Sequence, residues 1–134
     1  MNKLLLIAGL VALPAFADAA FELKGDAAKG EPQFKNMCVA CHGEKGDGNG
    51  PAGAALNPKP GNFTDPASVD RLTPEYVYKM IKLGGQANGK SAMMVAWSGA
   101  LNDQQIRDVA AYVLKFKSAK AAAPAPAADP KKKK

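Results

Sequence analysis

The sequence of 134 residues predicts a small all-α protein with three main helices. Three segments, at residues 26–37, 73–85 and 102–116, carry apolar side chains at helical spacing. No segment shows the apolar–polar alternation of a strand, and no internal repeat is present. Residues 20–117, which contain all three segments, have the size of one domain.

The first helix is predicted at residues 26–37, where five residues are the apolar or close-approach positions. These are Ala27, Ala28, Gly30, Phe34 and Met37. Pro32 lies inside the run and lacks the N–H group that an interior helical position needs. We therefore expect this helix to start late or to kink at Pro32.

The second helix has a clear start and end. Thr73 is a good N-cap, Pro74 suits the first helical position, and Glu75 suits the positive end of the helix dipole. Gly84-Gly85 is a typical C-terminal signal. The stripe between them that we expect to face the core consists of Val77, Met80 and Ile81.

The third helix is the clearest. Asn102 and Gln105 have the spacing of a capping box, and Asp103 favours the first turn. The helical stripe that follows comprises Ile106, Val109, Ala110, Val113 and Phe116.

Cys38-Val39-Ala40-Cys41-His42 is the most informative motif in the chain. It contains the only two cysteines and the only histidine. In a C-x-x-C-H motif, both thiols can form thioethers to haem vinyl groups, and the adjacent imidazole can ligate the iron. We expect one covalent haem c on Cys38 and Cys41, with His42 as an axial ligand.

Other uses of these residues fit less well. A thioredoxin-like site needs a βαβ setting, and no strand-like run precedes Cys38. A structural zinc site needs four Cys or His ligands, and the chain has three such residues. A disulfide across so short a loop would constrain the unfolded chain little.

The N-terminus predicts export. Lys3 precedes an apolar run at residues 4–13, and Ala17-Asp18-Ala19 matches a cleavage site. Ala15-Phe16-Ala17 is a rival site. The run is shorter than the roughly 20 residues that span a bilayer. We expect residues 1–19 to be a signal peptide and the mature protein to be soluble and periplasmic.

The basic charge lies mainly in the C-terminal segment. Residues 20–117 contain 12 basic and 10 acidic residues, for a net charge of +2, whereas residues 118–134 contribute +4. This distribution argues against nucleic-acid binding, which favours a basic face on the folded domain. The Ala/Pro/Lys-rich composition of residues 118–134 predicts a disordered tail. Lys131–Lys134 could solubilise the protein or contact an acidic partner or anionic surface.

Residues 25–117 resemble the class I cytochromes c of the small bacterial, monohaem type. Gly30, Phe34 and Tyr112 match the family's crossing of its first and last helices. The resemblance implies three main helices and long loops wrapped around one covalent haem. The Gly/Pro/Asn-rich stretch between His42 and Leu72 would then surround the haem edge, with Leu56 or Phe63 packed on it.

The resemblance also implies further site residues. Gly50-Pro51 resembles the family's Gly-Pro, whose proline carbonyl accepts a hydrogen bond from the haem histidine. Residues 91–97 resemble the loop that supplies the second axial ligand, a methionine. Counting back from Trp97 selects Met94, and Met93 is the alternative because Val95 replaces the family's proline. Trp97 would pack near the haem or bond a propionate.

Two weaker motifs predict loops. Residues 84–91 satisfy the P-loop pattern, but a helix precedes them where a P-loop needs a strand. Asp47-Gly48-Asn49-Gly50 lacks the carboxylates of a calcium loop and predicts a tight turn.

With His42 and Met94 as ligands, the iron would have no open position for a substrate. We therefore expect a non-enzymatic one-electron carrier, monomeric, with transient redox protein partners. The alternative is an enzyme role, as the haem subunit of an oxidoreductase or as a small peroxidase. A gas-binding haem protein is a third possibility, but its commonest c-type form carries the motif near the C-terminus.

Overall fold

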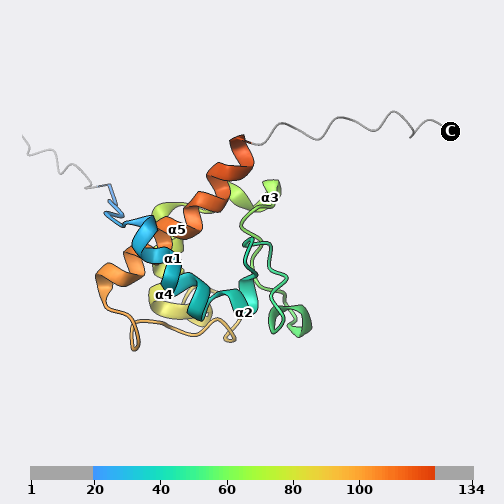
Figure 1. Ribbon diagram of the computed structural model, residues 1–134. Helices are drawn as coiled ribbons and strands as arrows, with labels where there is room; N and C mark the ends of the chain where they lie inside the picture. The colour runs from blue at the N-terminus through green and yellow to red at the C-terminus, as the bar shows by residue number, and fades with distance from the viewer. Residues whose placement is uncertain (1–19, 123–134) are drawn as a thin grey trace, which may run out of the picture.

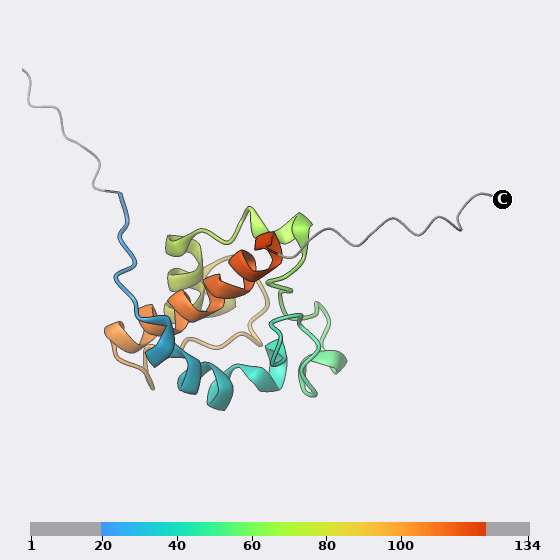
Figure 2. The same ribbon diagram turned by 45° about the horizontal axis from the view of Figure 1, so that its top comes forward.

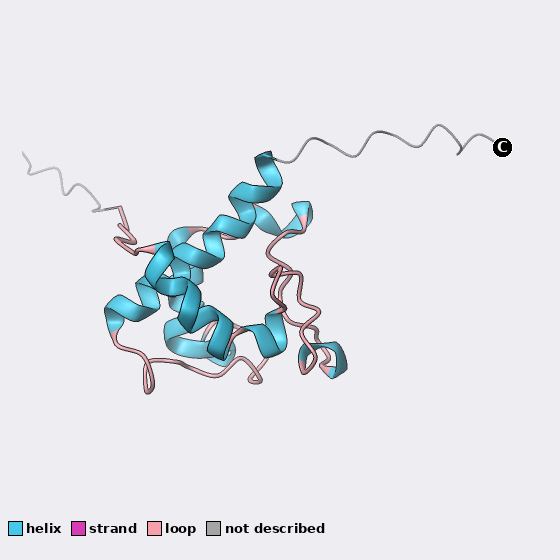
Figure 3. Ribbon diagram, in the orientation of Figure 1, coloured by secondary structure: helices cyan, strands magenta, loops and turns pink. Residues whose placement is uncertain are grey.

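The computed structural model describes residues 20–122, with side chains to Lys117. The predicted signal peptide and residues 123–134 of the predicted tail lie outside this range. The described elements are all helical and contain no strand, which confirms the all-α prediction (Figure 3). In chain order they are α1 (Ala27–Met37), α2 (Val39–His42), the 3-10 turn η1 (Gly53–Ala55), α3 (Pro66–Val69), α4 (Pro74–Ala87) and α5 (Asp103–Ala122).

Helices α1 and α5 cross at close range, and α4 packs against another part of α5 (Figures 1 and 2). At the crossing, a Cβ atom on Gly30 would lie 2.0 Å from the Asp108 carbonyl oxygen, so only glycine fits. The rings of Phe34 and Tyr112 lie beside it with centroids 5.2 Å apart. The predicted roles of these residues in the crossing are confirmed.

Helix α1 does not start late. It begins at Ala27, where the Asp26 carboxylate caps it by accepting the Ala28 N–H at 2.9 Å. The helix continues through Pro32, whose side chain is exposed. Burial of Gly30 and Phe34 against α5 on both sides of Pro32 outweighs the lost backbone hydrogen bond.

The predicted end signals of the other two helices are confirmed. The Thr73 hydroxyl accepts the Tyr76 N–H at 3.2 Å. Asn102 and Gln105 each accept the other's backbone N–H at 2.9 Å. The regular part of α4 ends at Gly84, which has φ 78° and ψ 173°. Helix α5 extends to Ala122, five residues beyond the predicted domain end at Lys117.

The core lies between α1, α4 and α5. Its members are Phe34, Leu72, Val77, Tyr78, Ile81, Leu101, Ile106, Val109, Ala110 and Val113. The Asp103 carboxylate ties α4 to α5 at the surface: it accepts hydrogen bonds from Lys82 at 2.8 Å, from Arg107 at 2.7 Å, and from the Tyr78 hydroxyl. Arg107 also donates to the Glu22 and Leu23 carbonyls, which fixes the segment before α1.

The segment from Gly43 to Leu72 is mostly irregular, as predicted, and returns to α2 (Figure 1). The Gly48 N–H donates to the His42 carbonyl at 2.9 Å, and the Ala52 N–H donates to the Ala40 carbonyl at 2.8 Å. Asp47 accepts the Asn49 N–H at 3.1 Å, which confirms the tight turn. None of the described helices combines the length and apolarity needed to cross a bilayer.

Candidate functional site

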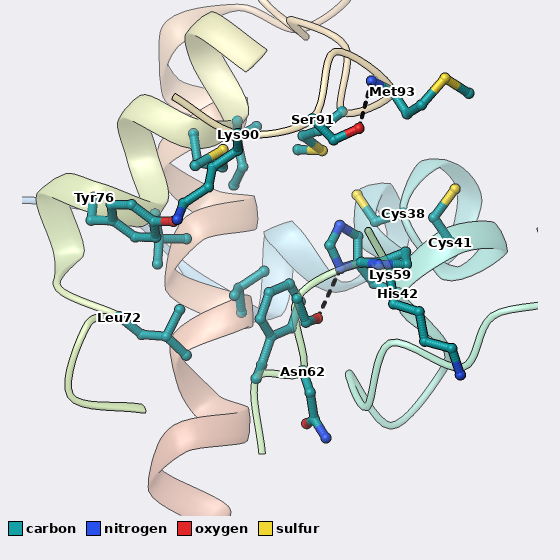
Figure 4. Close-up of a pocket in the computed structure, with 18 of the residues that line it drawn as sticks. Cys38, Cys41, His42, Lys59, Asn62, Leu72, Tyr76, Lys90, Ser91 and Met93 are labelled. Carbon is teal, nitrogen blue, oxygen red and sulfur yellow. Dashed lines mark hydrogen bonds between the residues drawn. The ribbon is translucent and has the colours of Figure 1, made fainter. Parts of the chain in front are cut away.

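Cys38 and Cys41 lie one helical turn apart at the start of the short helix α2. The His42 N–H donates to the Cys38 carbonyl at 2.9 Å, which closes this turn. Both thiols are free and half-buried. Figure 4 shows the two sulfur atoms extending from α2 in the same direction, with the His42 ring beside them. Burial, and secondarily the neighbouring Cys41, raises the pKa of the Cys38 thiol to about 11.

The His42 ring is held from two sides. Its Nδ1 atom donates to the Gly61 carbonyl at 3.3 Å, and its face stacks on Phe63 with centroids 4.7 Å apart. Burial lowers the pKa of His42, although the bond to Gly61 acts in the opposite direction. The imidazole is therefore kept in the neutral form that ligates metals, with Nε2 left for the ligand bond.

The prediction that the Pro51 carbonyl accepts this hydrogen bond is wrong. Pro51 is exposed, and the acceptor is the Gly61 carbonyl. Gly50 lies so close to α2 that a Cβ atom there would be 2.3 Å from the Val39 carbonyl oxygen. The chain stays against α2 through Ala52 and Gly53, and it reaches the His42 ring at Gly61, after the Pro58-Lys59-Pro60 turn.

A cavity of about 620 Å³ opens beside the motif. This volume lies within the roughly 300–1,000 Å³ of cofactor pockets. Apolar side chains from three helices form much of its wall: Phe34, Met37, Val77, Ile81, Val109 and Val113. Leu56 and Phe63 also line it, as expected for side chains packed on a haem. Met80, predicted to belong to the core, is half-buried and lines the cavity instead.

Ser91 and Met93 lie across the cavity from His42 (Figure 4), and Met94, Val95 and Trp97 of the same segment also line the cavity. The two adjacent methionines of this segment differ in environment. The Met93 side chain is 65% exposed, and it lines the cavity as Met94 does. Met94 is half-buried and packs against the core. Trp97 is also half-buried, packs against the core and lines the cavity.

Among the described residues, the basic ones that line the cavity are Lys59, Arg71 and Lys90, and no acidic one lines it. None of the three forms an ion pair with an acidic side chain of residues 20–117. In Figure 4, Lys90 extends toward Tyr76 at the end of the cavity away from Cys38 and Cys41. Lys90 is exposed, and its positive charge at this end of the cavity would attract an anionic group.

The described residues contain no cluster of three or more His, Cys, Asp or Glu side chains that could bind a metal ion unaided. The P-loop-like residues 84–91 include the end of α4 and are not preceded by a strand, so they do not form a phosphate-binding loop of that kind. The site therefore suits an apolar ring system with thiol-reactive groups at one edge and carboxylates at the other.

The sequence model of the family described as Cytochrome c matches residues 27–117. The chain belongs to the class I cytochrome c family. Its cofactor is one covalently bound haem c, and its function is electron transfer. The residues present fit this cofactor: two free thiols, one neutral imidazole, an apolar cavity, and Lys90 at the end of the cavity away from the thiols.

Individual relatives support the same family. Cytochrome c-554(548) from Halomonas halodenitrificans is 33% identical over 88 residues, which cover 66% of this chain and 93% of that protein. The cbb3-type cytochrome c oxidase subunit FixP from Bradyrhizobium diazoefficiens is 36% identical over 88 residues. That match covers 66% of this chain but only 27% of FixP, so the chain spans about a quarter of the oxidase subunit.

A solved structure of the Kuenenia stuttgartiensis reducing HAO-like protein complex Kustc0457/Kustc0458 contains a similar chain. The TM-score is 0.55 at 26% identity, and the match covers 78% of this chain and 49% of the other.

Sequence reasoning missed several residues of the site. The Gly61 carbonyl carries no side-chain signal, although the preceding Pro58-Lys59-Pro60 turn marks a reversal of the chain. The cavity-lining cations Arg71 and Lys90 were not distinguishable from ordinary surface charges. Both line the cavity only because residues 66–76 and 84–97 fold around it.

Proposed function

We propose that this chain is an exported monohaem carrier that passes single electrons between redox proteins, with His42 and Met94 as axial ligands. The observation that supports it best is the position of His42 and of residues 91–97 on opposite sides of one apolar cavity. A site ligated from both sides leaves no open position for a substrate, which favours electron transfer over catalysis.

One-electron exchange between ferric and ferrous iron is the chemistry that haem c supplies when bound. Cys38 and Cys41 hold the cofactor by two thioethers, and the Gly61 carbonyl orients His42. Met94 supplies a soft thioether sulfur, which favours the reduced state and raises the potential. The apolar walls of the cavity exclude water, which has the same effect on the potential.

Basic residues that line the cavity would offset the two carboxylates of the cofactor. Haem carries its propionates opposite the vinyl edge that the cysteines bind. Lys90 and Arg71 line the cavity and lack ion-pair partners among residues 20–117, so they are suited to this role. Trp97, which lines the same cavity, would pack against the ring.

Export and partner choice belong to the same proposal. Residues 1–19 would direct the chain to the periplasm, residues 20–117 would form the working domain, and the lysines at 131–134 would add a salt-sensitive contact with an acidic partner or anionic surface. We propose a monomer that forms small, transient contacts, because rapid exchange suits a carrier.

A second function is favoured by the relatives. Because FixP is described as an oxidase subunit, a role as the haem subunit of a larger oxidoreductase is the alternative. Purification from the native host discriminates the two: a carrier elutes alone at its monomer mass, whereas a subunit co-purifies with fixed stoichiometry.

A spectroscopic experiment tests the carrier proposal. The purified chain should retain one haem per polypeptide after denaturation. The folded protein should show a methionine–iron charge-transfer band when ferric and should bind carbon monoxide poorly when ferrous. High-spin bands together with ready carbon monoxide binding would overturn the proposal, because they would show an open coordination position.

A further inference from the structure

The segment that contains Met94 is bound to the end of α4 by a set of backbone hydrogen bonds. The Gly85 N–H donates to the Met94 carbonyl at 2.7 Å, and the Lys90 N–H donates to the Gly85 carbonyl at 2.8 Å. The Trp97 N–H donates to the Ile81 carbonyl at 3.0 Å. The bonds to the Gly85 and Ile81 carbonyls satisfy acceptors that a helix end otherwise leaves unpaired. They connect the segment to α4 on both sides of Met94.

The two residues at the centre of this arrangement are glycines in tight contact with the Met94 segment. A Cβ atom on Gly85 would lie 2.0 Å from the Ser91 carbonyl oxygen and 3.2 Å from the Met94 Cβ. A Cβ atom on Gly84 would lie 2.8 Å from both the Met94 carbonyl oxygen and the Ala96 nitrogen. All but the Met94 Cβ are backbone atoms, so side-chain rotation cannot relieve these contacts.

Gly84 has a second requirement. Its backbone has φ 78° and ψ 173°, a region that only glycine occupies readily. This conformation ends the regular helix and turns the next residue so that the Gly85 N–H faces Met94. The side chain of Asn88 fixes the same turn by donating to the Gly84 carbonyl at 2.7 Å. An alanine at either position would therefore displace the Met94 segment or distort α4.

We infer that Gly84 and Gly85 are positioning residues for the axial methionine. Their close backbone contacts determine where the Met94 segment lies beside the cavity. The inference rests on the proposed ligation by Met94. Its physical basis is that a metal–thioether bond tolerates little displacement, whereas a methyl group at Gly85 requires the Ser91–Met94 backbone to move. Contact between nonbonded heavy atoms is favourable only near about 3.5–4.0 Å.

The first experiment compares Gly84→Ala and Gly85→Ala with Gly99→Ala in the haem-loaded protein. Gly99 has no heavy atom within 4 Å of the added methyl position, so it is a matched control. We expect the Gly84 and Gly85 variants to lose most of the methionine–iron band and to bind carbon monoxide at least tenfold more tightly. Gly99→Ala should match the unmodified protein, and Met94→Ala provides the reference for complete loss.

The outcomes separate the inference from the proposed function. If Met94→Ala keeps the methionine band, the proposed ligand is wrong. If Met94→Ala loses the band while Gly84→Ala and Gly85→Ala keep both the band and the original carbon monoxide affinity, the positioning role is wrong and the proposed function stands.

A second measurement does not depend on the glycine variants folding. If the hydrogen bonds position Met94, ligation must in turn stabilise them, because coupling between two sites is reciprocal. In Met94→Ala, hydrogen exchange at the Gly85, Lys90 and Trp97 amides should be at least tenfold faster. The Gly30 amide, which donates to Asp26 in α1, should keep its rate. Unchanged exchange at all three amides would overturn the inference.

Discussion

The imidazole of His42 lies nearly parallel to the ring of Phe63, with the planes inclined by 21° and the centroids 4.7 Å apart. Phe63 in turn stacks on Phe116 of α5, at a centroid distance of 6.2 Å. The His42 ring is thus supported by a loop residue and, through it, by the last helix. Its orientation depends on contacts between segments far apart in the sequence.

Phe63→Leu should leave the covalent haem in place while loosening His42. We expect a loss of about 0.5–1.5 kcal/mol in the free energy of unfolding, the usual contribution of an aromatic pair. Denaturant unfolding of the haem-loaded protein measures this change, and paramagnetic NMR shifts of the His42 protons report ring orientation. Phe21→Leu, which removes another aromatic pair, should alter stability without moving those shifts. Unmoved shifts in both variants would contradict the supporting role of Phe63.

Met94→Ala and Met93→Ala should differ sharply. Met94 packs on the core, so its removal should eliminate the methionine–iron band and lower the reduction potential. Met93 is 65% exposed, and its removal should leave both properties unchanged. Optical spectra and a potentiometric titration of the two variants check the assignment. The reverse pattern would make Met93 the ligand.

Lys90→Gln should lower the reduction potential, because a nearby positive charge favours the reduced state. The effect should be on the order of tens of millivolts at low salt and should shrink as salt is added. Lys79→Gln removes the same charge from a lysine that pairs with Glu75 and does not line the cavity. Voltammetry of both variants at two ionic strengths measures the difference. Equal shifts would argue for a general charge effect and against a specific role of Lys90.

Gly30→Ala should destabilise the crossing of α1 and α5. The added methyl group would lie 2.0 Å from the Asp108 carbonyl oxygen, so the helices must separate. We expect a cost of about 3 kcal/mol or more, at the upper end of overpacking effects. Thermal or denaturant unfolding, with Gly99→Ala as the control, tests this expectation. A loss in the free energy of unfolding no larger than that of Gly99→Ala would show that α1 and α5 can separate at little cost.

Asp103→Asn should change how stability depends on pH. Hydrogen bonds from Lys82, Tyr78 and Arg107 hold the pKa of Asp103 well below its usual range. A lowered folded-state pKa stabilises the protein above the ordinary aspartate value of about 3.9, and this contribution is lost as the pH falls toward the folded-state value. The variant should therefore have a lower free energy of unfolding than the original protein at pH 7. This difference should become smaller below pH 4.

Denaturant unfolding at pH 7 and pH 3 measures that gap. Glu75→Gln, which breaks the surface pair with Lys79, should show a much smaller difference between the two pH values. A gap of equal size at both pH values would show that Asp103 acts through its shape rather than its charge.

Local patterns were sufficient for much of this protein. The helix signals at Thr73, Gly84 and Asn102 act through hydrogen bonds within a few residues, so they are readable without knowledge of the fold. The C-x-x-C-H motif is equally local, because one helical turn places both thiols and the imidazole together. The helix start was mispredicted at Pro32, because the packing that compensates for it comes from α5.

Three features depend on the folded chain. They are the hydrogen-bond acceptor for His42, the cations that line the cavity, and the glycine contacts with the Met94 segment. Gly61 reaches His42 only because the loop doubles back to α2. Gly85 faces Ser91 and Met94 only because α4 ends where the chain reverses. Propensities and spacings are properties of neighbouring residues, and they specify which helices form and where the cofactor attaches. Contacts across the cavity are set by packing between distant segments, so they emerge only when the whole domain is assembled.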